Sequence, residues 1–144
     1  MNLPWVHPVN LRILAKQKIA GVWSQIVAPR ALATPSKSKP FKVVSNTSSE
    51  MTIEVGTGKK LLVISRENLE STIDYLNVHD HDSHKPCRLD ANTDPIKAGP
   101  LCLACRKTPA GDYGPRLITY VLPILADVGV VGLNGDAPAT TWLI

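Results

Sequence analysis

The sequence lacks several features, and each absence excludes a class of protein. No apolar run approaches the roughly 20 residues that a membrane-spanning helix needs, so a transmembrane protein is excluded. Three cysteines cannot all pair within one chain, which argues against a disulfide-stapled secreted domain. No secretion signal with an apolar stretch and a small-residue cleavage site is present. We therefore expect a cytoplasmic or nucleoid-associated protein that does not act at a membrane.

The common catalytic motifs are also absent. The chain contains no G-x-x-x-x-G-K-[ST] phosphate loop, no G-x-S-x-G nucleophile elbow and no H-E-x-x-H metal motif. Gly56-Thr57-Gly58 is followed by two lysines, but strand-like residues flank it, and we interpret it as a hairpin turn. These absences favour a protein that is not an enzyme.

The chain does have enough apolar material for a core, and its charge is unevenly distributed. Of 144 residues, 44% are hydrophobic and 19% are charged, as in an ordinary globular domain. Residues 1–49 carry seven basic and no acidic side chains, whereas residues 50–144 carry nine basic and twelve acidic ones. A basic arm on a mildly acidic body favours contact with phosphate or with an acidic surface, although a solvated lysine-rich helix would have the same composition.

The basic N-terminal part is predicted to be a helix followed by a linker. Pro8–Val27 begins with proline, which suits a first helical turn, and its apolar residues recur at helical spacing. The expected buried stripe consists of Leu11, Leu14, Ile19, Val22, Trp23 and Ile26. Residues 28–40 are rich in Pro, Ser, Ala and Lys without a period, which is typical of a linker. We therefore predict two units, residues 1–40 and residues 41–144.

Residues 41–144 are predicted to form an α+β domain of short strands, three helices and a terminal hairpin. Strands are expected at Phe41–Val44, Met51–Val55 and Lys60–Ile64. Helices are expected at Arg66–Leu76, with Ser65 as its N-cap, and at Pro100–Lys107 and Arg116–Val128. The terminal hairpin is expected to pair Val130–Leu133 with Thr140–Leu143 across the turn dipeptide Asn134-Gly135.

From Lys60 onward, the order of elements resembles the winged-helix family of helix-turn-helix domains. The segment that carries the resemblance is Pro115–Gly129, a third helix ended by glycine, followed by Val130–Gly135, which would begin a two-stranded wing. The resemblance covers residues 60–144. It implies a non-enzymatic DNA-binding protein, such as a regulator or the recognition module of a nucleic-acid system, whose third helix enters the major groove.

The two faces of the third helix are expected to have different roles. The buried stripe would be Leu117, Val121, Ile124, Leu125 and Val128. The opposite face carries Arg116, Thr119, Tyr120, Pro123 and Asp127. Arg116 is able to donate two hydrogen bonds to guanine, and Thr119 and Tyr120 to reach phosphate or a thymine methyl. Further DNA contacts are expected from Lys107, Arg12, Lys16, Lys37, Lys39 and Lys42.

Two features favour a protein partner instead of DNA. Pro123 removes a backbone donor from the middle of the third helix and kinks it. The wing tip, residues 134–138, contains Asp136 and no basic residue, so it would repel phosphate. The same scaffold would then serve as a protein–protein interaction module or an inhibitor. A winged helix that reads a palindrome would be a dimer, but no coiled-coil heptad signals one.

Four residues have the spacing of a zinc site. His84-x2-Cys87 and Cys102-x2-Cys105 are separated by fourteen residues, and a two-residue gap lets both ligands of a pair reach one ion. Zinc would staple the loop-like stretch 77–99. Alternatively, Cys102 and Cys105 are buried thiols on the apolar side of a helix.

A third hypothesis is a small metal-dependent nuclease. Asp80-His81-Asp82, followed by Cys102-x2-Cys105, is similar to the HNH-type recombination endonucleases of phages. The similarity implies that His81 activates water and that Asp80 or Asp82 holds Mg²⁺ against the scissile phosphate.

Overall fold

The computed structural model describes residues 8–144, with side chains from residue 11 onward. Its helices are α1 (Pro8–Val22), the short 3-10 helix η1 (Trp23–Gln25), α2 (Arg66–Val78), α3 (Pro100–Arg106) and α4 (Ile118–Asp127). Its strands are β1 (Arg30–Ala33), β2 (Pro40–Asn46), β3 (Glu50–Val55), β4 (Lys60–Ser65), β5 (Cys87–Arg88), β6 (Val131–Asn134) and β7 (Thr140–Leu143). None of the described helices is both long and apolar enough to cross a membrane.

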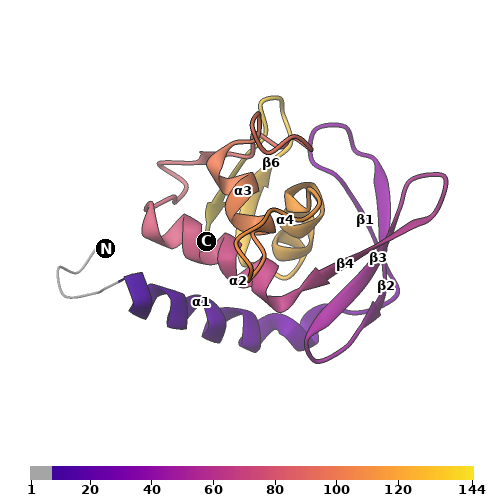
Figure 1. Cartoon of the computed structure of the whole chain (residues 1–144), viewed down its shortest axis with the longest axis horizontal. Helices are drawn as coiled ribbons and strands as arrows, with labels where there is room; N and C mark the ends of the chain where they lie inside the picture. The colour runs from indigo at the N-terminus through magenta and orange to yellow at the C-terminus, as the bar shows by residue number, and fades with distance from the viewer. Residues whose placement is uncertain (1–7) are drawn as a thin grey trace.

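The strands form two antiparallel sheets, which confirms the predicted α+β class. The first sheet is a meander with the order β1-β2-β3-β4. The second has the order β5-β7-β6, so the last strand of the chain lies in its centre. Figure 1 shows α1 and α2 running together on one side of the molecule and the four-stranded sheet on another, with α4 enclosed among α2, α3 and β1.

The predicted hairpin before α2 and the start of that helix are confirmed. The predicted strands Met51–Val55 and Lys60–Ile64 correspond to β3 and β4 within one residue. The hydroxyl of Ser65 accepts a hydrogen bond from the Asn68 N–H at 3.3 Å, and the Asn68 side chain accepts one from the Ser65 N–H at 2.8 Å. This reciprocal capping box satisfies two backbone donors and fixes where α2 begins.

The prediction of a linker over residues 28–40 is wrong for part of that segment. Arg30–Ala33 is the edge strand β1, which pairs with β2 from Arg30↔Val43 to Ala33↔Pro40. Its residues are not β-branched, and cross-strand packing overrides their weak intrinsic preference. The Pro-, Ser- and Lys-rich residues that suggested a linker form the tip of the β1–β2 hairpin, residues 34–39.

Three smaller predictions also need correction. Leu14 does not belong to the buried stripe of α1 and is 50% exposed, because Ala15 and Ile19 are the fully buried residues and the small alanine lets α1 approach α2 closely.

α4 begins at Ile118, after the proline-restricted segment that contains Arg116, so Arg116 precedes the helix. The β6–β7 connection is longer than two residues, because the Asn134 side chain accepts a hydrogen bond from the Asp136 N–H and starts an Asx turn.

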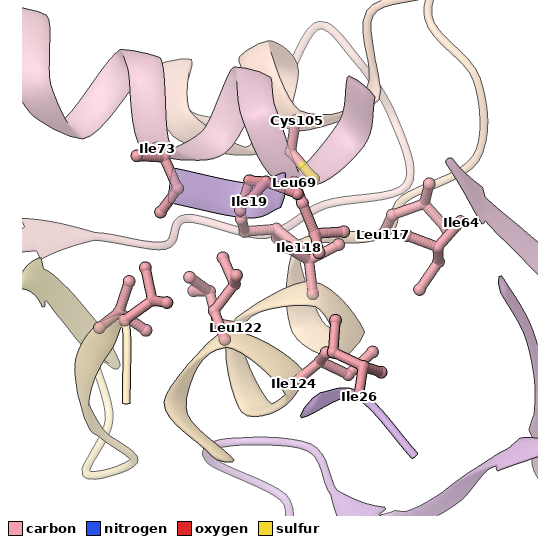
Figure 2. Packing of buried hydrophobic residues seen from close by; sticks show 14 of the residues in the cluster. Ile19, Ile26, Ile64, Leu69, Ile73, Cys105, Leu117, Ile118, Leu122 and Ile124 are labelled. Carbon is pink, nitrogen blue, oxygen red and sulfur yellow. The ribbon is translucent and has the colours of Figure 1, made fainter. Parts of the chain in front are cut away.

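One cluster of buried side chains joins both sheets and all four α-helices. Ile19 of α1, Ile53 of β3, Leu69 of α2 and Leu101 of α3 are all fully buried in it. Figure 2 shows the α4 side chains within this cluster, with Leu122 between α4 and α2. Burying one such side chain contributes about 1.5–3 kcal/mol, so the cluster is the main source of stability.

α4 is buried on nearly every side. Its buried residues are Ile118, Val121, Leu122, Pro123, Ile124 and Leu125. On the side away from α2, the ring of Tyr120 meets Phe41 of β2 edge-on, with centroids 5.2 Å apart and the planes at 75°. At the end of the helix, Asp127 accepts two hydrogen bonds from the Arg30 guanidinium of β1, at 2.6 and 3.1 Å. The predicted exposed face of this helix is therefore covered by the β1–β2 hairpin.

Candidate functional site

A cleft of about 510 Å³ lies where the β1–β2 hairpin tip, the start of α4 and the β6–β7 hairpin meet. We call it the basic cleft. Its main lining residues are Thr34, Pro35, Lys37 and Lys39 of the tip, Leu89, Asp90 and Ala91 of the loop after β5, Arg116, Thr119 and Tyr120 at α4, and Pro138 and Ala139. A volume of this size is typical of pockets that bind small molecules or single residues of a polymer. Five residues predicted to contact DNA, far apart in sequence, line it together.

Local hydrogen bonds hold the two lysines of the cleft at the hairpin tip. The Thr34 N–H donates to the Lys39 carbonyl, and the Lys39 N–H donates to the Thr34 hydroxyl, both at 2.9 Å. Between them, Ser38 adopts a positive φ of 48°, which reverses the chain within a few residues. This closed tip carries Lys37 and Lys39, and both lysines are exposed.

Arg116 and Thr119 reach the cleft from the start of α4 and leave polar atoms unsatisfied. The Nε of Arg116 and the Oγ1 of Thr119 are buried and have no hydrogen-bond partner among the described residues. A buried donor or acceptor without a partner costs about 1–3 kcal/mol. Pro123 also has no N–H to donate to the Thr119 carbonyl, which a regular helix residue would do. The polar groups of this turn are thus incompletely satisfied within the protein.

The positive charge in the cleft is not neutralised locally. Within residues 8–144, no carboxylate forms an ion pair with Lys37, Lys39 or Arg116. The one carboxylate among the described lining residues is Asp90, whose Oδ1 lies 3.1 Å from an Nη of Arg88. Three cations facing one concave surface raise the local positive potential and attract anions.

The β6–β7 hairpin and the loop after β5 form another part of the cleft wall. The Leu89 N–H donates to the Ala139 carbonyl at 3.1 Å, which ties this loop to the hairpin. A Cβ on Gly135 would lie 2.7 Å from the backbone carbonyl oxygen of Pro35, so only glycine allows the two hairpin tips to approach this closely. Figure 1 shows the β1–β2 and β6–β7 loops beside each other. The two tips together frame the cleft.

The other basic residues predicted to bind DNA lie elsewhere. Arg12 and Lys107 line a second hollow of about 320 Å³ between α1, α2 and the end of α3, which we call the α1–α2 groove. There, Arg12 pairs with Asp74 at 3.6 Å, and Glu67 is also part of the lining. Lys16 is exposed on α1, and Lys42 lies opposite Glu54 across the β2–β3 pair.

The predicted zinc ligands are separated between an exposed turn and the interior. His84 is exposed, whereas Cys87, Cys102 and Cys105 are buried free thiols. Burial raises the pKa of Cys87 to about 11 and the pKa of Cys105 to about 12, because a thiolate would be poorly solvated there. Within residues 8–144, no three His, Cys, Asp or Glu side chains are arranged to hold a metal ion. The alternative of buried thiols describes this arrangement, and zinc binding stays a prediction.

The residues of the nuclease hypothesis make contacts within their own loop. The Nδ1 of His81 lies 2.8 Å from the Lys85 carbonyl. One carboxylate oxygen of Asp82 accepts hydrogen bonds from the N–H groups of His84 and Lys85, at 2.8 and 3.1 Å. Asp80 has a positive φ of 55° at the end of α2. These contacts shape the loop, and the catalytic roles stay a prediction.

Comparison of the chain with protein-family models, with curated proteins and with solved structures gives no match in any of the three. Function therefore has to follow from the chemistry of the basic cleft itself. That chemistry combines uncompensated cations, an unsatisfied hydroxyl and an aromatic ring with an apolar wall.

Proposed function

We propose that this protein binds DNA without cleaving it, and that the phosphate backbone is recognised in the basic cleft. The observation that carries the proposal is the convergence of Lys37, Lys39 and Arg116 on one concave surface without a compensating ion pair among the described residues. Each phosphate contact of this kind releases counterions, and such contacts supply most of the affinity of DNA-binding proteins. Arg116 adds a planar fork of donors that matches phosphate geometry.

We further propose that α2 to β7 is a winged-helix-like unit in which the β6–β7 hairpin is the wing. In support, three helices are followed by a two-stranded hairpin, and α4 directly precedes it. Unlike a recognition helix, however, α4 is covered by β1 and by Phe41. The proposal therefore puts the DNA contact at the N-terminal end of α4 and the neighbouring hairpin tip, and not along the helix.

The proposal is tested by titrating labelled DNA with the protein and following fluorescence anisotropy at several salt concentrations. The test variant is Lys37→Ala with Lys39→Ala, and the matched control is Lys16→Ala with Lys18→Ala on α1. All four lysines are exposed, and both variants lose two positive charges. We expect the cleft variant to reduce the slope of log affinity against log salt by about two, because each lysine that contacts a phosphate contributes about one.

The control variant should bind nearly as well as the natural protein. Equal losses in both variants would mean that only net charge matters and would contradict a binding cleft. No binding of any DNA at low salt would overturn the proposal and favour the protein–protein interaction module.

A further inference from the structure

We infer that the basic cleft receives a single unpaired nucleotide, so that single-stranded DNA is preferred over a blunt duplex. The inference rests on the proposed function and specifies its ligand. A cleft of about 510 Å³ is large enough for one nucleotide. It is too small for a base-paired duplex, which can touch the rim with one strand but cannot enter.

The lining of the cleft has a charged part and an apolar part, which match the phosphate and the base of a nucleotide. Lys37, Lys39 and Arg116 provide positive charge for the phosphate. The wall formed by Leu89, Ala91 and Ala139 is apolar and is held in place by the Leu89–Ala139 hydrogen bond. Proteins that bind single strands combine the same two elements, a basic track for the backbone and an apolar or aromatic surface for the bases.

Tyr120 provides the aromatic surface. It is half-buried and lines the cleft, and the edge-on contact with Phe41 fixes its ring. A ring that is already fixed loses little conformational entropy when a base stacks on it. Every base has a π-face, so stacking on Tyr120 predicts binding with little sequence preference.

Unsatisfied polar atoms at the start of α4 also indicate that a ligand binds in the cleft. The Arg116 Nε and the Thr119 Oγ1 lack partners among the described residues, although both side chains line the cleft. A phosphate in the cleft brings several acceptor oxygens to the side chains that carry these donors. Two of the five side-chain atoms of this kind among the described residues lie at this cleft, and buried polar atoms without a partner are uncommon in proteins.

The experiment compares three labelled DNAs of one sequence: a single strand, a blunt duplex and the duplex with a single-stranded overhang. We expect the single strand and the overhang to bind at least about 10-fold more tightly than the blunt duplex, in line with the stacking contributions measured for single-strand binding proteins. Tyr120→Leu, which keeps the apolar packing, should remove most of that preference.

Thr119→Val separates a ligand contact from a structural role. Valine has the shape of threonine without the hydroxyl, so we expect single-strand affinity to fall several-fold while Tm stays equal or rises, because an unsatisfied buried hydroxyl is removed. Arg116→Lys, which keeps the charge but loses the Nε, should likewise weaken binding of the single strand more than binding of the duplex.

The outcomes distinguish this inference from the proposal on which it rests. Equal affinity for the single strand and the blunt duplex, unchanged in Thr119→Val, would overturn the nucleotide pocket and leave DNA binding intact. Absence of binding to all three DNAs would overturn both.

Discussion

The basic cleft and the α1–α2 groove are both hollows lined by residues that the sequence marked as DNA contacts, yet their charges differ. In the groove, Arg12 pairs with Asp74 at 3.6 Å and donates to the Ser71 hydroxyl at 3.4 Å. In the basic cleft, Lys37, Lys39 and Arg116 have no such partner among residues 8–144. Cations of equal formal charge thus have an acidic ion-pair partner in one hollow, whereas in the other the one lining carboxylate, Asp90, pairs with Arg88 instead.

The comparison shows that an anion site is marked by basic side chains that share a hollow without an ion-pair partner, and not by formal charge alone. The seven basic residues of the acid-free segment 1–49 look like one basic arm in the sequence. In the fold, they are distributed over α1, β1, the β1–β2 tip and β2. Acids from the second half of the chain pair with Arg12 and Arg30, and of the lysines that remain, Lys37 and Lys39 lie in the basic cleft. The field at a surface depends on this three-dimensional sum.

Reversing the charge of the cleft should have the largest effect. Lys37→Glu with Lys39→Glu places two carboxylates where we expect phosphate to bind. We expect DNA affinity to fall by about 100-fold at moderate salt, measured by anisotropy. Because both side chains are exposed, urea denaturation should show an unchanged unfolding midpoint. Retention of affinity would place the DNA on the other side of the molecule.

Disturbing the frame of the cleft should come next. In Gly135→Ala, the new Cβ would lie 2.7 Å from the Pro35 carbonyl oxygen, so the two hairpin tips must move apart. We expect a loss of about 1–3 kcal/mol in the free energy of unfolding, together with weaker DNA binding. Gly58→Ala is the control, because a Cβ at that position would point into open space with no neighbour within 4 Å. A stable Gly135→Ala protein would show that the tips are not in fixed contact.

High pH should destabilise the whole fold through the buried thiol of Cys105, which lies in α3 against α2 and away from the basic cleft. The pKa of Cys105 is raised from 9.0 to about 12, mainly by burial, so the folded state keeps a proton that the unfolded state loses. Stability is then fully present below pH 9 and declines as the pH rises toward 12, by about 1 kcal/mol per pH unit. Cys105→Ala should reduce this decline in urea titrations between about pH 8 and 10, leaving the part due to Cys87, and an unchanged slope would contradict the shifted pKa of Cys105.

The smallest effect should come from making the groove resemble the cleft. Glu67→Gln with Asp74→Asn removes two acids beside Arg12 and Lys107 without changing side-chain shape much. We expect DNA affinity to rise by only a few-fold, because partly exposed ion pairs contribute about 0–1 kcal/mol. The unpartnered buried atom in the groove, Oδ1 of Asp74, is moreover an acceptor and not a donor like those of Arg116 and Thr119. An affinity gain as large as the loss from charge reversal in the cleft would show that the two hollows are equivalent.

Much of the secondary structure could be predicted because it depends on local signals. The Ser65 cap, the turn at Gly56 and the β-branched, apolar runs of β3 and β4 are properties of a few consecutive residues, and all three are present in the structure. The edge strand β1 carried no such signal, because its residues are neither β-branched nor alternating, and it forms only by pairing with β2.

The role of α4 was harder to predict, although one signal was available. Its sequence has no charged residue before Asp127, and a helix that is apolar all round is buried rather than amphipathic. The predicted exposed face, which included Pro123 and Asp127, is inconsistent with this apolar pattern. The Arg30–Asp127 pair and the Phe41 contact could not be foreseen, since each joins segments that are far apart in the chain.

The sequence by itself determined the α+β class, the capped start of α2 and the identity of Lys37, Lys39, Arg116, Thr119 and Tyr120 as candidate anion contacts. Propensity, capping and side-chain chemistry are local properties, so they can be read from neighbouring residues. Only the tertiary structure decided which cations remain uncompensated and which side chains share one cleft. Distances between charges set their interaction, and those distances arise when the β1–β2 tip, α4 and the β6–β7 hairpin pack together.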